Sequence, residues 1–161
     1  MTSSSKRILK VWLPSVIWIA IITLESTNLG SGAHTARLLN WIFHFLFGIK
    51  IARLSFWNNL LRKTGHVIGY AIMSALFFRS WRGTFPRLST QWCLQWSTIA
   101  VLSTALVASL DEWHQSFLPS RTGAFRDVLL DTAAALAAQL ILFAVLRSKS
   151  RNQREYIVEH R

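Results

Sequence analysis

Long apolar runs alternate with short polar segments along the chain. Crossing a bilayer as a helix takes about 17–25 residues, and four runs reach that length: Ile8–Leu24, Phe56–Phe78, Trp92–Leu110 and Ala124–Leu146. A fifth run, Leu38–Ile49, is too short to span and is rich in aromatic residues. Such a segment is typical of a helix that lies along the membrane interface or re-enters the membrane. The pattern therefore predicts an all-α, polytopic membrane protein with four transmembrane helices and one short interfacial or re-entrant helix.

The second predicted span has a polar first half. Lys63, His66 and Tyr70 stand at positions i, i+3 and i+7, which places them on one face of a helix. Lipid does not accept such a face, so we expect it to point into the helix bundle or into a wet cavity. In the fourth span, the small residues of Ala133–Ala138 are expected to let a neighbouring helix approach closely.

Composition and charge support the membrane assignment. The chain is 52% hydrophobic and only 16% charged, whereas soluble domains average about 25% charged residues. The net charge of +11 comes largely from three basic clusters beside the apolar runs: Lys6, Arg7 and Lys10; Arg79, Arg82 and Arg87; and Arg147, Lys149, Arg151, Arg154 and Arg161. Clusters in these places follow the positive-inside rule, and no nucleic-acid-binding motif accompanies them. We therefore expect no nucleic acid partner.

The basic clusters also predict the topology. With four spans, both termini and the loop at residues 79–87 face the cytoplasm, which indicates a multi-pass protein of the cytoplasmic (inner) membrane. A full span at residues 38–49 would instead put the C-terminus on the opposite side. We expect a transmembrane domain over residues 1–146 and a basic, mobile cytoplasmic tail over residues 147–161. Cys93 is the only cysteine, so no intrachain disulfide can form.

The polar stretch Asp111–Asp127, between the third and fourth spans, concentrates ionisable side chains. Three of the seven acidic residues of the chain lie in it. Ionisable groups at the edge of a membrane are expensive to keep and usually have a function. In the four-span order this stretch meets Glu25, at the end of the first span, and Lys63 and His66, at the start of the second. We therefore expect a polar pocket that faces the extracytoplasmic side.

Three blocks of the chain form a recognisable pattern: Lys63-x-x-His66-x-x-x-Tyr70, Asp111-Glu112-x-x-Gln115-x-Phe117-x-Pro119-x-Arg121 and Asp127-Val128-Leu129. The pattern resembles the VanZ-like family of small bacterial membrane proteins over roughly residues 10–146. That family is named after a protein associated with low-level resistance to teicoplanin, and most of its members have no established biochemical activity. The chain departs from the pattern at Asp131, where an Asn is usual, and at Ala134 or Ala135, where a Gly is usual.

The resemblance and the predicted pocket together suggest an envelope protein that binds or modifies an anionic, lipid-linked substrate. Partners would be membrane lipids, with a lipid-linked cell-wall precursor as one candidate. Acid and base roles are assigned to His66 with Asp111 or Glu112, because an imidazole and a carboxylate are groups that act as general acid and base in enzymes. The substrate-binding residues are expected to be Lys63, Gln115, Arg121, Arg126 and Asp127. The arginines can bind a phosphate through two hydrogen bonds, and the lysine can bind it as a point charge.

Three other interpretations stay open. The charged residues can form a purely structural network, with Asp111 or Glu112 paired to Arg121 and Asp127 paired to Lys63. A small proton-coupled transporter would use the same groups, although the spans show no obvious inverted repeat. A metal site can be built from Glu25, His66, Asp111 and Glu112, but no compact ligand motif supports it. We expect neither a metal nor another cofactor.

Overall fold

The computed structural model describes residues 3–27, 32–48, 53–85, 92–119 and 123–159. Within these ranges the chain forms five helices and no strand: α1 Ser3–Ser26, α2 Gly32–Phe47, α3 Leu54–Thr84, α4 Leu94–Gln115 and α5 Phe125–Glu159. Each predicted apolar run overlaps one of these helices. The predicted all-α class is confirmed for the described part of the chain.

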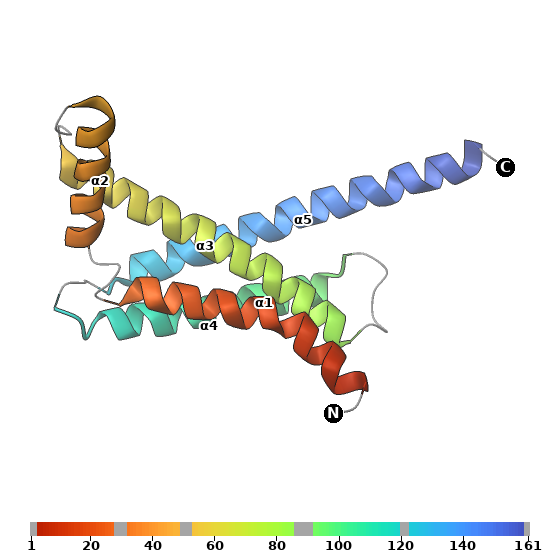
Figure 1. Ribbon diagram of the computed structural model, residues 1–161. Helices are drawn as coiled ribbons and strands as arrows, with labels where there is room; N and C mark the ends of the chain where they lie inside the picture. The colour runs from red at the N-terminus through yellow and green to blue at the C-terminus, as the bar shows by residue number, and fades with distance from the viewer. Residues whose placement is uncertain (1–2, 28–31, 49–52, 86–91, 120–122, 160–161) are drawn as a thin grey trace.

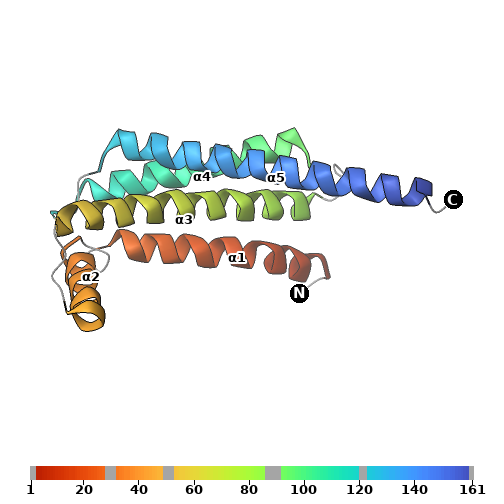
Figure 2. The same cartoon turned by 90° about the horizontal axis from the view of Figure 1, so that it is seen from above.

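Helix α3 lies in the middle of the bundle. It contacts α1, α4 and α5, while α2 stands crosswise at the end where α3 begins (Figures 1 and 2). The central position follows from the apolar second half of α3, where Tyr70, Met73, Phe77 and Phe78 are buried. These side chains pack against partners from the flanking helices, including Trp96 of α4. The core of the bundle is therefore built around α3.

The outer faces of the other long helices are apolar. Leu13, Leu102 and Leu140 are among the large hydrophobic side chains that remain exposed there. By length and composition, three helices of the described chain can cross a membrane: Ser5–Ser26, Leu94–Gln115 and Phe125–Ser148. Helix α3, which contains the predicted second span, is not among them, because Arg62, Lys63 and His66 make its first half polar. A membrane protein is thus supported, but the count of four spans is not confirmed by these criteria.

Several helix boundaries differ from the sequence prediction. Helix α4 begins at Leu94 and continues past Leu110 to Gln115, so the first turn of the polar stretch is helical. Helix α5 continues beyond Leu146 to Glu159, so the segment predicted to be a mobile tail has a helical backbone up to that residue. This segment is rich in Arg, Lys, Gln and Glu, which favour helix once a preceding helix has nucleated it. Helix α2 also begins earlier than predicted, at Gly32.

Small and polar residues hold α3 close to α5. Ala134 and Ala135 are buried at this contact, and the Ser74 hydroxyl donates a hydrogen bond to the Ala135 carbonyl at 3.2 Å. The side-chain amide of Gln139 donates to the carbonyl oxygen of Ser74 at 3.0 Å and to its hydroxyl at 2.8 Å. The close approach expected from the alanine-rich segment is therefore observed, with α3 as the partner.

Replacing Gln139 with alanine should weaken this contact modestly. Hydrogen bonds between membrane helices contribute about 0.6 kcal/mol on average and rarely more than about 1.7, so the free energy of unfolding should fall by roughly 1 kcal/mol. Unfolding of the purified protein in detergent, followed by circular dichroism, measures the change. The neighbouring Leu140→Ala, at a side chain that is 69% exposed, is the matched control and should change the stability less.

Candidate functional site

Four helix ends meet at one end of the bundle. Helices α1 and α4 end there, and α3 and α5 begin there, whereas α1 begins and α5 ends toward the opposite end (Figures 1 and 2). The up-and-down order of the helices thus brings Glu25, Lys63, His66, Asp111 and Asp127 to the same end of the molecule. The convergence predicted from the order of apolar and polar segments is observed.

Helix α3 presents two side chains to acidic partners on α5. The ammonium group of Lys63 lies 3.4 Å from Asp127, and Nδ1 of His66 lies 3.4 Å from a carboxylate oxygen of Asp131. These residues are one turn apart on each helix, so the two pairs are stacked along the α3–α5 contact. The Lys63 side chain is 64% exposed, so its pair with Asp127 contributes little stability. Asp131, in contrast, is fully buried.

Helix α4 supplies the partner of Tyr70. The phenol of Tyr70 donates a hydrogen bond to Oδ2 of Asp111 at 3.0 Å, and the amide of Gln115 donates to the same oxygen at 3.0 Å. The Gln115 amide also lies 3.3 Å from the hydroxyl of Ser26, at the end of α1. The predicted face formed by Lys63, His66 and Tyr70 therefore contacts α5 through its first two members and α4 through the third.

Glu112 joins α4 to the segment that leads into α5. Its side chain is buried, and its Oε2 accepts a hydrogen bond from the backbone amide of Ala124 at 2.8 Å. The preceding residue, Gly123, packs against the end of α4 so closely that a Cβ atom there would contact the Glu112 carbonyl and lie 2.9 Å from the amide nitrogen of Ser116. The end of α4 and the start of α5 are thus held together by a buried carboxylate and a glycine.

His66, Asp111 and Glu112 come together across α3 and α4. One potential ligand atom from each residue lies within 4.8 Å of the other two. This proximity fits the acid and base roles that the sequence suggested for the same three residues. It also unites three of the four residues of the metal alternative, while the fourth, Glu25, lines the groove beside them.

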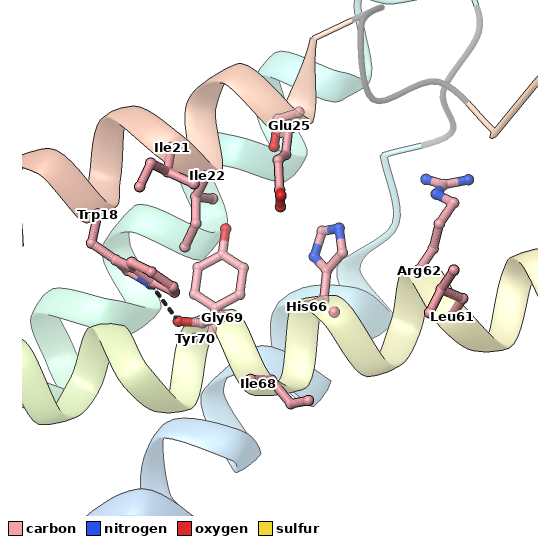
Figure 3. A pocket seen from close by; sticks show the side chains of 12 residues that line it. Trp18, Ile21, Ile22, Glu25, Leu61, Arg62, His66, Ile68, Gly69 and Tyr70 are labelled. Carbon is pink, nitrogen blue, oxygen red and sulfur yellow. Dashed lines mark hydrogen bonds between the residues drawn. The ribbon is translucent and has the colours of Figure 1, made fainter. Parts of the chain in front are cut away.

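Two cavities border His66. The first, of about 390 Å³, is a groove between α1 and α3 (Figure 3). Trp18, Ile21 and Ile22 lie at one end of the groove, and Glu25, His66 and Arg62 lie toward the other, where Leu61 is also found (Figure 3). The indole of Trp18 donates a hydrogen bond to the Gly69 carbonyl at 2.9 Å and so closes the apolar end of the groove.

The second cavity, of about 260 Å³, lies between the beginnings of α3 and α5 and the end of α4. It is predominantly polar, with a lining that consists of Asn59, Arg62, Lys63, His66, Glu112, Gln115, Asp127, Leu130 and Asp131. Arg62 and His66 line both cavities. An amphipathic groove and a charged cavity therefore share two cationic or ionisable side chains.

The structure brings most of the expected site residues together. Five of them line the charged cavity: Lys63, His66, Glu112, Gln115 and Asp127. Asp111 lies directly beside it through its contact with Gln115. Arg126 is exposed and lines neither described cavity, so its assignment to substrate binding finds no support in the geometry. Arg121 lies outside the described residues.

The sequence interpretation missed Arg62 and treated Asp131 only as a departure from the family pattern. Arg62 precedes His66 by four residues, so helical periodicity alone places the two on one face. Asp131 follows Asp127 by four residues in the same way, and it is the partner of His66. The spacing of these residues was a usable signal for both.

Comparison with known proteins identifies the family. The family model described as VanZ/LLP1 matches residues 11–147. This segment runs from α1 into α5 and includes every residue of the two cavities. No curated protein and no solved structure matches the chain significantly. Because the match covers most of the 161 residues, the chain belongs to the VanZ/LLP1 family.

Proposed function

We propose that the chain is a four-span protein of the bacterial cytoplasmic membrane, and that the groove and the charged cavity together bind a lipid with an anionic phosphate head group. The lipid tail would lie in the groove between α1 and α3, and the phosphate near Arg62, Lys63 and His66. A lipid-linked cell-envelope intermediate fits this description. Such a role agrees with the glycopeptide resistance implied by the family resemblance.

Helix α3 supplies the fourth span in this proposal. Its 31 residues extend over about 45 Å, which exceeds the roughly 30 Å hydrocarbon core of a bilayer. It lies among α1, α4 and α5, which are the three helices apolar enough to cross a membrane. Its polar residues Arg62 and His66 line cavities inside the bundle, where charged groups are tolerated.

The orientation follows from the basic clusters. Lys6, Arg7 and Lys10 in α1 and Arg79 and Arg82 in α3 lie at the end of the bundle opposite the two cavities. The positive-inside rule assigns that end to the cytoplasm. Both termini are then cytoplasmic, and the cavities open toward the extracytoplasmic side, where cell-wall precursors are used. Helix α2 would lie along the membrane interface, as its crosswise position at that end suggests (Figure 2).

The observation that carries the lipid proposal is the shared wall of the two cavities. Arg62 and His66 stand where the apolar groove meets the charged cavity, as the view in Figure 3 shows for the groove side. The Nε atom of Arg62 is buried and has no hydrogen-bond partner among the described residues. A guanidinium group in this position is suited to bind a phosphate. If the bound lipid is also modified, His66 with Asp111 and Glu112 would transfer the protons, which their proximity supports.

A structural network is the second candidate. It is favoured by the pairs that the ionisable residues already form, Lys63 with Asp127 and Tyr70 with Asp111. In that case the cluster closes the end of the bundle and needs no ligand. The two candidate functions differ in whether the purified protein retains a bound anionic lipid.

Native mass spectrometry of the protein in detergent should detect retained lipid directly. We expect undecaprenyl phosphate to be retained at least tenfold better than phosphatidylcholine with chains of ordinary length. Gly65 lines the groove, and a Cβ there meets no atom within 4 Å, so Gly65→Trp should fold normally, fill the groove and abolish this preference. Gly65→Ala is the matched control and should retain the lipid.

The phosphate contacts are tested in the same way. Arg62→Ala combined with Lys63→Ala should remove the preference for the anionic lipid, whereas Lys10→Ala, at the opposite end of α1, should leave it unchanged. Equal retention of the two lipids by the unmodified protein would contradict the proposal and favour the structural network. Incubation with the retained lipid, followed by product analysis, separates binding from catalysis.

A further inference from the structure

His66, Asp111 and Glu112 form a three-residue set with the chemistry of a metal centre. One imidazole nitrogen and two carboxylate oxygens lie within 4.8 Å of one another. A tetrahedral zinc ion holds such ligands at about 2.0–2.2 Å, which puts them roughly 3.3–3.6 Å from one another. Rotation of the three side chains would have to bring these atoms roughly 1 Å closer together around the ion. We propose that these three residues bind one divalent transition-metal ion, such as Zn²⁺ or Mn²⁺.

Each of the three residues is held by a neighbour through one atom, which leaves its other atom for the ion. Asp111 accepts two hydrogen bonds on Oδ2, from Tyr70 and Gln115. Glu112 accepts the Ala124 amide on Oε2. Metal ligands in proteins are commonly fixed in this way by a second set of hydrogen bonds, which orients them before the ion arrives.

The third ligand, His66, is oriented by Asp131. Its Nδ1 lies 3.4 Å from Oδ2 of Asp131. An imidazole that donates Nδ1–H to a carboxylate presents the lone pair of Nε2 to a cation, which is the usual arrangement of a metal-bound histidine. His66 would therefore bind the ion through Nε2.

A second observation that supports a cation site is the burial of Asp131. Its side chain is fully buried and lines the charged cavity, yet its Oδ1 has no hydrogen-bond partner among the described residues. Three carboxyl groups, those of Asp111, Glu112 and Asp131, thus lie around one imidazole. Buried carboxylates are unfavourable unless a cation neutralises them. Lys63 contacts Asp127 and is mostly exposed, and Arg62 at the cavity wall supplies one positive charge against three carboxyl groups, so a bound metal ion would supply the further neutralising charge.

The ligand set also limits the identity of the ion. Nitrogen from an imidazole together with carboxylate oxygen suits Zn²⁺ and Mn²⁺, whereas Ca²⁺ and Mg²⁺ prefer oxygen ligands alone. Three protein ligands leave at least one coordination position open. That position would face the cavity lined by Arg62 and Lys63. The cation site rests on its own geometry and does not require the lipid proposal to hold.

Metal binding is tested on the full chain in detergent, without added lipid. After treatment with EDTA, the protein should take up about one equivalent of Mn²⁺, counted by electron paramagnetic resonance, or of Zn²⁺, counted by elemental analysis. His66→Gln and Glu112→Gln should each lower the affinity at least tenfold. His114→Gln is the matched control and should bind the metal normally. The His114 side chain is exposed on α4, the helix that carries Asp111 and Glu112, and lies outside the three-residue set.

A spectroscopic signature guards against variants that merely misfold. Pulsed resonance of the Mn²⁺-loaded protein should show coupling to an imidazole nitrogen, and Asp131→Leu should alter this signal or weaken binding about 10–100-fold. Uptake of less than a tenth of an equivalent, or binding that lacks nitrogen coupling or survives in His66→Gln, would overturn the cation site. Lipid retention measured in the presence of EDTA is a separate readout, so failure of one proposal is distinguished from failure of the other.

Discussion

Replacing Ala135 with leucine should push α3 and α5 apart. Ala135 is completely buried where the Ser74 hydroxyl meets its carbonyl oxygen, so a larger side chain has no space. Overpacking of this kind lowers stability by about 1–3 kcal/mol, and loss of the Ser74 hydrogen bond adds about 0.5–1.5 kcal/mol. The free energy of unfolding should therefore fall by roughly 2–4 kcal/mol, which detergent unfolding experiments can measure.

Ala137→Leu is the matched control, since it makes the same change two residues away at an exposed position of α5. It should leave stability within about 0.5 kcal/mol of the original. The Ala135→Leu variant should also lose the contacts of His66 with Asp131 and of Lys63 with Asp127, because both depend on the distance between α3 and α5. Equal stability of the two variants would show that α3 and α5 do not pack as described.

Replacing Gly123 with valine should disrupt the site by displacing the residues that contact Glu112. Any Cβ at this position would contact the backbone of Glu112 and Ser116, which cannot rotate away. The segment must then move, and the hydrogen bond from Ala124 to the buried carboxylate of Glu112 is lost. Steric strain of about 1–3 kcal/mol and an unsatisfied buried acceptor of similar cost together predict a loss of roughly 2–5 kcal/mol.

The measurement for Gly123→Val is the unfolding free energy in detergent together with lipid retention, both of which should decrease. Gly65→Ala serves as the control for loss of a glycine, because a Cβ there meets no atom within 4 Å. In a helix this exchange should be neutral or stabilising, by up to about 1 kcal/mol. A Gly123→Val protein with unchanged stability would contradict the close packing of this segment on α4.

Much of the site could be predicted because helical periodicity and the order of the helices can both be read directly from the sequence. The spacing of Lys63, His66 and Tyr70 placed them on one face, and the alternation of apolar runs placed Asp111 and Asp127 at the same end. The individual partners could not be predicted in this way. That His66 meets Asp131 depends on how far α3 and α5 slide along each other, which small residues such as Ala135 determine.

The groove between α1 and α3 and the hydrogen bond between Glu112 and Ala124 could not be predicted from the sequence for a different reason. The groove depends on Gly65 and Gly69, whose small size leaves space between α1 and α3, and on Trp18 reaching the Gly69 carbonyl. The contact of Glu112 with Ala124 depends on how closely Gly123 packs against the end of α4, where a Cβ atom would meet the backbone of Glu112 and Ser116. Hydrophobic periodicity carries no information about either feature. Both depend on glycines, which have no side chain, and not on apolar side chains that repeat along a helix.

The polarity of α3 has a consequence for how the protein is made. A lysine or arginine at the centre of a membrane helix opposes insertion by about 2.5–3.5 kcal/mol, and by less toward the helix ends; α3 carries Arg62 and Lys63 in its first half. The carboxyl groups that accompany this half in the folded protein, Asp111, Asp127 and Asp131, belong to helices synthesised later. In the proposed four-span topology, helix α3 would therefore leave the ribosome without its partners and enter the bilayer stably only when α4 and α5 arrive. Insertion of this chain would then be a cooperative event of its last three long helices, rather than a sequence of independent steps.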